Sequence, residues 1–119
     1  MRMHFNPPIH PGEMLREEFM APLKLSAGKI AKAIGVPRTR IERLIRKETA
    51  LSTETAVLLA RFFGTSEQMW INMQTHYELD CAAIDTDLNA ALDTIVPLPR
   101  PDLEGGIPLS EDVPGDAAA

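Results

Sequence analysis

The stretch that decides the fold is SAGKIAKAIGVPRTRIERLIRK, Ser26–Lys47. Ser26 is a good N-cap for a first short helix, and Gly35 can adopt the positive φ that ends it. Pro37 then favours the first turn of a second helix. Because only Gly35 and Val36 separate the two helices, they cannot run antiparallel and must cross at a steep angle. The spacing therefore predicts a helix-turn-helix over residues 26–47.

Apolar residues occupy the positions that a helix-turn-helix has to bury. Ala31 lies one turn before Gly35, where two short helices approach each other and a small side chain is needed. Ile41 and Leu44 follow at helical spacing, with Ile45 beside them, and would anchor the second helix to the core. The second helix therefore has to turn its other side toward the solvent.

The outward side of the second helix is strongly basic. At about 100° per residue, Thr39 and Arg43 point away from the apolar residues, and Arg38 flanks them at the N-terminal end. This is the arrangement of a recognition helix, whose first residues meet base edges in the major groove. We predict base contacts for Arg38, Thr39 and Arg43. Phosphate contacts are predicted for the basic residues around them: Lys29, Lys32, Arg40, Arg46 and Lys47.

The charge of the chain is unevenly distributed. Its 119 residues carry a formal net charge of −5, but residues 1–64 hold 11 Lys and Arg against 6 Asp and Glu, whereas residues 65–119 hold 1 against 11. A basic N-terminal half can attract a polyanion although the whole protein is acidic. The alternative is that the basic helix is only a solvated face. Its place in a helix-turn-helix favours DNA binding over that alternative.

The remaining elements are also predicted to be helices, which gives an all-α fold of five helices. One helix begins at HPGE, His10–Glu13, and ends near Pro22. Another follows Ser52 and ends at Gly64.

The last helix is predicted to be long. It begins at Thr65 or Ser66, where Thr65 and Gln68 would form a capping box. Its apolar stripe runs through Trp70, Met73, Tyr77, Cys81, Ile84 and Leu88 and, if the helix continues, through Leu92 and Ile95. Trp70 and Met73 are expected in the core. For Ile84, Leu88 and Leu92 we favour a dimer interface, the alternative being that the whole stripe is core. The folded domain is predicted to span residues 1–96, and residues 97–119, with five Pro and three Gly, to form a flexible acidic tail.

The sequence gives little reason to expect an enzyme. It contains no HExxH, no CxxC and no Gly-rich phosphate loop, and His4, His10 and His76 are scattered. We therefore predict no catalytic site, no metal site and no cofactor, and expect His10 to order the start of the first helix. A single cysteine, the absence of a signal peptide and the shortness of every apolar run indicate a cytoplasmic protein with no membrane segment.

Three segments together resemble the HigA-type antitoxins, which are helix-turn-helix proteins of the Xre and lambda-repressor-like class. They are PIHPGEMLREEFMAPLKLS (Pro8–Ser26), GVPRTRIERLIR (Gly35–Arg46) and TAVLLARFFGTSEQMWINMQTHYEL (Thr55–Leu79). The resemblance implies a dimeric five-helix antitoxin that neutralises a RelE-like ribonuclease toxin and represses its own operon at a palindromic operator. By position, Arg38, Thr39 and Arg43 fall where relatives contact bases.

The chain departs from the family pattern at three positions. Lys47 stands where a Gly usually follows the recognition helix, so that helix is expected to end differently or to extend slightly. Gly28 stands inside the preceding helix where a bulkier side chain is usual, and Ala27 replaces a polar residue that often contacts phosphate. These departures bear on DNA affinity more than on the fold.

Two alternatives to an antitoxin stay open at the level of sequence. The first is a stand-alone transcriptional regulator without a toxin. The second, with less support, is an interaction module that has lost DNA binding. Acidic residues of the second half could attract a basic ribonuclease, although an acidic tail more often serves solubility. The acids concerned on the folded part are Glu78, Asp80, Asp85, Asp87 and Asp93.

Overall fold

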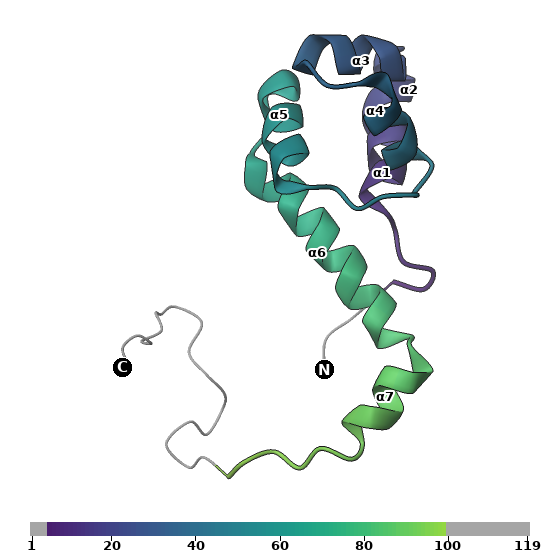
Figure 1. The fold of residues 1–119 in the computed structure, drawn as a ribbon, viewed down its shortest axis with the longest axis vertical. Coiled ribbons are helices and arrows are strands. Elements are labelled where there is room, and N and C mark those ends of the chain that lie inside the picture. The colour runs from purple at the N-terminus through teal and green to yellow at the C-terminus, as the bar shows by residue number, and fades with distance from the viewer. Residues whose placement is uncertain (1–4, 100–119) are drawn as a thin grey trace, which may run out of the picture. The chain divides into compact units, whose positions relative to one another are not determined.

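The computed structural model describes residues 5–99, and every regular element in that range is helical (Figure 1). The elements are α1 (Pro11–Met14), η1 (Leu15–Met20), α2 (Ala21–Leu23), α3 (Ala27–Ile34), α4 (Arg38–Ile45), α5 (Thr53–Phe63), α6 (Glu67–Ala83) and α7 (Thr86–Leu92). The all-α prediction is confirmed. Among these helices, none has the length and apolar character that crossing a membrane requires.

The chain divides into two compact units, Met1–Asn89 and Ala90–Ala119. The first contains the predicted helix-turn-helix. The described part of the second begins with the end of α7, after which Thr94 donates a side-chain hydrogen bond of 2.7 Å to the Ala91 carbonyl. Most of the predicted tail, residues 97–119, lies outside the described residues. The predicted domain boundary at residue 96 stays a prediction.

The first helix is built from α1, η1 and α2 in succession. His10 precedes it, and its Nδ1 accepts a hydrogen bond of 2.9 Å from the Gly12 N–H, so His10 orders the helix start as predicted. The central segment η1 is a π-helix, whose wider turns lead into Pro22, a residue without an N–H to donate. The helix ends at Leu23, and Lys24 adopts a left-handed conformation with φ of 55°.

Most predicted helix boundaries are confirmed by their caps. Ser26 and Ser52 each accept a hydrogen bond of 3.1 Å from a backbone N–H three residues on, and Gly35 and Gly64 have positive φ. The predicted capping box of Thr65 and Gln68 is not formed, so that prediction was wrong. Ser66 caps α6 instead, because the Thr65 hydroxyl accepts a hydrogen bond of 2.7 Å from the Trp70 indole N–H.

The prediction of one long last helix was also wrong. Helix α6 ends at Ala83, and α7 begins at Thr86. Asp85 ends the continuity, because its carboxylate accepts a hydrogen bond of 3.0 Å from the Leu88 N–H. A short acidic side chain at this position competes for the backbone N–H groups of the next turn and starts a new helix. The apolar stripe read from the sequence is therefore carried by two helices.

The hydrophobic core collects residues from η1, α3, α4, α5 and α6. Leu15, Ile30, Ile41, Leu59 and Trp70 are fully buried. The rings of Phe19, Phe63 and Trp70 pack against one another, with centroid separations of 4.7 to 6.1 Å.

The loop between α4 and α5 is fixed to α6 by one buried hydrogen bond, because Gln74 Oε1 accepts from the Leu51 N–H at 2.8 Å. The loop that follows α4 is therefore secured to α6.

Helix α1 approaches the end of α4 so closely that only glycine fits. A Cβ built on Gly12 would lie 1.8 Å from the carbonyl oxygen of Leu44 and 2.7 Å from its carbonyl carbon. Both are backbone atoms, which cannot move without displacing α4. The glycine of the HPGE motif therefore sets the distance between the first helix and the recognition helix.

We predict that Gly12→Ala destabilises the protein by about 3 kcal/mol, since the added methyl overpacks a backbone contact. Urea unfolding followed by circular dichroism measures this. Gly28→Ala is the matched control, because its Cβ would meet side-chain atoms and no backbone: the flexible Arg38 at 3.3 Å, and Ser26 Oγ at an ordinary contact distance of 3.9 Å. It should stabilise the protein by up to about 1 kcal/mol through helix propensity. Equal effects of the two substitutions would contradict the packing argument.

Burial makes His10 sensitive to pH. His10 is 3% exposed, and its ring lies edge-on to Tyr77 at 4.8 Å. Desolvation by burial lowers the pKa of His10 below its ordinary value of 6.5, and the positive charge of Lys47 acts in the same direction; a hydrogen bond with the Thr49 backbone and the charge of Glu13 oppose them. The folded protein therefore prefers neutral His10.

We predict that the stability contributed by neutral His10 is present above pH 6.5 and is lost as pH falls from 6.5 through the lowered pKa of the folded state, because the unfolded chain takes up the proton first. Urea midpoints at about pH 7.5 and about pH 5.5 test this in wild type and His10→Asn, which keeps a capping oxygen but does not titrate. The wild type should lose more stability than the variant. An identical loss in both proteins would exclude His10 as the cause.

Candidate nucleic-acid interface

Helices α3 and α4 form the predicted helix-turn-helix. Gly35 has φ of 78°, and the N–H groups of Gly35 and Val36 both donate to the Ala31 carbonyl, at 2.8 and 3.0 Å. This closes α3 with a left-handed glycine turn. Pro37 occupies the N-cap position of α4, so the second helix begins one residue later than predicted, at Arg38.

The two sides of α4 differ as predicted. Ile41 and Leu44 are buried, with 0% and 2% exposure, and Ile45 is half-buried. The three residues predicted to contact bases, Arg38, Thr39 and Arg43, are all exposed. Their exposure follows from the register of α4, which burial of the apolar residues fixes. No part of residues 5–99 covers them.

The residues predicted to contact phosphate form a basic margin around α4. Lys29 and Lys32 are exposed on α3, Arg40 is exposed on α4, and Arg46 and Lys47 are exposed just after it. Helix α4 does not extend through Lys47. It ends at Ile45, and Lys47 adopts the left-handed conformation, with φ of 65°, that a glycine would take more easily.

Three arginines of α4 lie close to carboxylates, which the sequence analysis did not predict. Arg38 Nε lies 3.1 Å from Glu42, Arg40 Nη1 lies 3.2 Å from Glu54 and Arg43 Nε lies 3.7 Å from Glu48. These arginine side chains are 41 to 69% exposed. Exposed pairs of this kind contribute about 1 kcal/mol or less, so another anion can displace them. Within residues 5–99, Lys29, Lys32, Arg46 and Lys47 form no ion pair.

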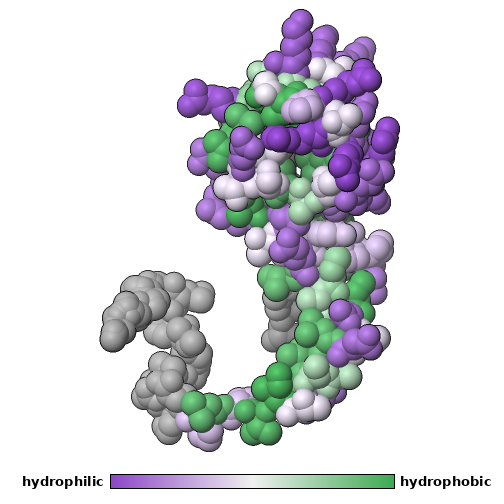
Figure 2. Space-filling model, viewed as in Figure 1, coloured by the Kyte–Doolittle hydropathy of each residue, from purple (hydrophilic) through white to green (hydrophobic). Residues whose placement is uncertain are grey.

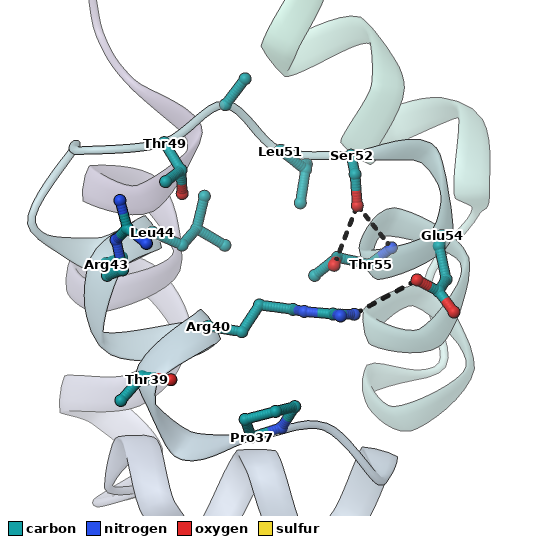
Figure 3. A pocket seen from close by; sticks show the side chains of 11 residues that line it. Pro37, Thr39, Arg40, Arg43, Leu44, Thr49, Leu51, Ser52, Glu54 and Thr55 are labelled. Carbon is teal, nitrogen blue, oxygen red and sulfur yellow. Dashed lines mark hydrogen bonds and ion pairs between the residues drawn. The ribbon is translucent and has the colours of Figure 1, made fainter.

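A groove runs beside the exposed face of α4 (Figure 3). Thr39, Arg40 and Arg43 line one side of it, and the loop and first turn of α5 line the other. Arg40 reaches across the groove to Glu54 on α5. The hydroxyls of Thr49 and Ser52 belong to this groove, and sequence analysis missed them as site residues because the helix-turn-helix pattern ends before them.

Several exposed apolar side chains lie at the end of α6 and on α7 (Figure 2). Ile84, Leu88 and Leu92, the predicted dimer residues, are 39, 40 and 52% exposed. Trp70 is fully buried and Met73 packs against the core, as predicted. Apolar residues with this degree of exposure are accessible to a partner. That they form a dimer interface stays a prediction.

Polar groups of α6 pair locally. His76 Nδ1 lies 2.9 Å from Asp80, so His76 interacts with Asp80 and not with Cys81. A hydrogen bond with Cys81, and then burial, raise the pKa of Tyr77. Asp80 is fully buried. It is therefore not accessible to a partner, contrary to the expectation from the sequence. In the described range, no three His, Cys, Asp or Glu side chains gather as a metal site would require.

Comparison with known proteins agrees with this geometry. Residues 15–70 match a family described as helix-turn-helix. Virulence-associated protein I of Dichelobacter nodosus is 44% identical over 92 residues, which are 77% of this chain and 82% of that protein. Antitoxin HigA-1 of Vibrio cholerae is 33% identical over 79 residues, 66% of this chain and 74% of the relative.

Among solved structures, antitoxin HigA of Pseudomonas aeruginosa, determined with the higBA promoter, is 35% identical and superposes with a TM-score of 0.71. The match covers 76% of this chain and 98% of the other. Identity at this level over nearly the whole of a relative, together with the exposed basic face of α4, establishes the relationship. This chain belongs to the HigA-type antitoxin family of helix-turn-helix proteins.

Proposed function

We propose that this protein is an antitoxin that binds operator DNA as a homodimer, represses its own operon, and neutralises a RelE-like ribonuclease toxin. The observation that carries the proposal is the exposed face of α4, where Arg38, Thr39 and Arg43 lie together while Ile41 and Leu44 fix the helix from behind. A planar guanidinium matches the O6 and N7 acceptors of guanine, and a threonine can bond or pack against a base edge.

The structure of a relative supports the DNA part. The HigA of Pseudomonas aeruginosa was determined with a promoter, and its fold matches most of this chain. In this chain Lys29, Lys32, Arg46 and Lys47 surround α4 and form no ion pairs among residues 5–99. They are suited to phosphates, which position a recognition helix without selecting a sequence. Arg40 joins them if phosphate displaces Glu54.

Dimerisation is proposed because one α4 makes too few base contacts for a long site. Two copies related by a twofold axis would contact half-sites about 34 Å apart, which is one turn of B-DNA. Ile84, Leu88 and Leu92 are exposed and apolar, so they are the residues we assign to the dimer interface.

Toxin binding is proposed from the exposed acidic residues and from membership of the HigA-type antitoxin family. Glu78, Asp85, Asp87 and Asp93 are exposed, and enzymes that bind RNA present basic surfaces that such acids attract. Asp80 is removed from this set because it is buried against His76. A stand-alone transcriptional regulator is the alternative function, and it shares every feature of α4.

We predict different effects from a base contact and a phosphate contact. Arg43→Ala should cost about 1 to 3 kcal/mol on the operator and leave binding to random DNA much less affected. Lys47→Ala should weaken both alike and reduce the salt dependence of binding by about one phosphate contact. Fluorescence anisotropy with the gene's own upstream region at two salt concentrations measures both effects. Unchanged operator binding by Arg43→Ala would remove Arg43 from the base-contacting set.

We predict that the product of an adjacent gene encoding a small basic RelE-like protein co-purifies with this chain and loses its ribonuclease activity in the complex. Tagged co-expression followed by an RNA cleavage assay tests this. Replacing Asp85 and Asp87 with Asn should weaken the complex, most at low salt. A chain that binds operator DNA but no such protein is a stand-alone regulator.

A further inference from the structure

The Arg38 side chain, which is 69% exposed, has two close neighbours. Its Nε lies 3.1 Å from Glu42 Oε2, one turn further along α4. Its aliphatic part passes over Gly28 of α3, since a Cβ built on Gly28 would lie 3.3 Å from Arg38 Cδ and 4.0 Å from Cγ. The stem of the side chain therefore lies against α3, and the guanidinium lies beside a carboxylate of α4.

The atom through which each arginine meets its carboxylate determines what it can still bind. A guanidinium carries its N–H donors in a planar fork, and bidentate contact with guanine needs two of them. Arg38 uses Nε toward Glu42, so its two terminal nitrogens stay available as a pair. Arg40 differs, because its terminal Nη1 is the atom paired with Glu54.

The presence of a carboxylate on the proposed DNA-facing side of α4 requires an explanation. Glu42 is 28% exposed and lies on the helix that we propose enters the major groove. A negative charge so close to phosphates weakens binding to any DNA. Orienting Arg38 would offset that cost on the operator, where a guanine is present, but not on random DNA.

We propose that Gly28 and Glu42 are positioning residues that direct the terminal nitrogens of Arg38 toward a guanine, and that they thereby determine the base pair required at one position of the operator. Gly28 departs from the family pattern. In this proposal, its missing side chain leaves the space over which the aliphatic part of Arg38 passes. The inference rests on the proposed function, because it requires that α4 contact DNA.

The proposal predicts opposite effects of Glu42→Ala on two DNAs. If Glu42 only repelled phosphate, its removal would strengthen binding to every sequence. If it only supported α4, its removal would weaken binding to every sequence. If it positions Arg38, its removal weakens operator binding and strengthens binding to random DNA.

The experiment first locates the Arg38 contact. Each G·C pair of the footprinted upstream duplex is exchanged for A·T, and the contact is the pair whose exchange costs wild type about tenfold in affinity and costs Arg38→Ala almost nothing. Anisotropy titrations at one salt concentration then compare the variants on this duplex and on a random duplex of equal length. Circular dichroism checks that each variant is folded.

Glu42→Ala should bind the operator about fivefold more weakly, bind random DNA about twofold more tightly, and lose its preference for guanine at the located pair. Glu42→Gln keeps an acceptor oxygen for Nε, so it should restore operator affinity to within about twofold of wild type while still binding random DNA more tightly. Gly28→Ala should melt at a higher temperature than wild type and yet reduce the preference for guanine about threefold.

Glu17→Ala is the control, because Glu17 also pairs with an arginine, Arg16, but lies on η1; its side chain is 55% exposed, against 28% for Glu42. It should change the ratio of operator to random affinity by less than about twofold. The inference is overturned if Glu42→Ala shifts both affinities in the same direction or keeps the preference for guanine. If wild type does not prefer the upstream duplex to random DNA, the proposed function fails together with the inference.

Discussion

The burial of Ile41 and Leu44 fixes the rotation of α4, and the arrangement of the functional surface follows from it. The helix has only eight residues, so its own hydrogen bonds could not hold it in place. Two buried side chains one turn apart leave a single orientation in which neither is exposed. In that orientation Arg38, Thr39 and Arg43 face the solvent.

Three contacts hold α4 against the rest of the domain. The Gly35 turn joins it to α3, the missing side chain of Gly12 lets α1 approach its last carbonyl groups, and the hydrogen bond from Leu51 to Gln74 secures the following loop to α6. A recognition helix has to keep its position within fractions of an ångström to select a base. Backbone contacts and a buried hydrogen bond provide that precision better than surface ion pairs do.

Charge on this protein is organised locally. The chain is acidic as a whole, yet basic residues surround α4, and the carboxylates nearest to its arginines are few and individually weak partners. Glu42, Glu48 and Glu54 lie beside guanidinium groups that stay exposed to solvent. Acidic residues exposed on α6 and α7 lie on other helices, so they leave a basic face intact for a polyanion.

The sequence by itself determined the helical class, the helix-turn-helix, its caps at Ser26 and Gly35, and the outward arginines, because these depend on local propensity and on the 3.6-residue period. It failed at Asp85, where a side-chain hydrogen bond divides one expected helix into two, and at Thr65, whose hydroxyl accepts from Trp70 instead of capping. Only the tertiary structure decided that Arg40 meets Glu54, that Gly12 lies against Leu44 and that Asp80 is buried. Those features depend on the packing of segments that are far apart in sequence, which no local pattern contains.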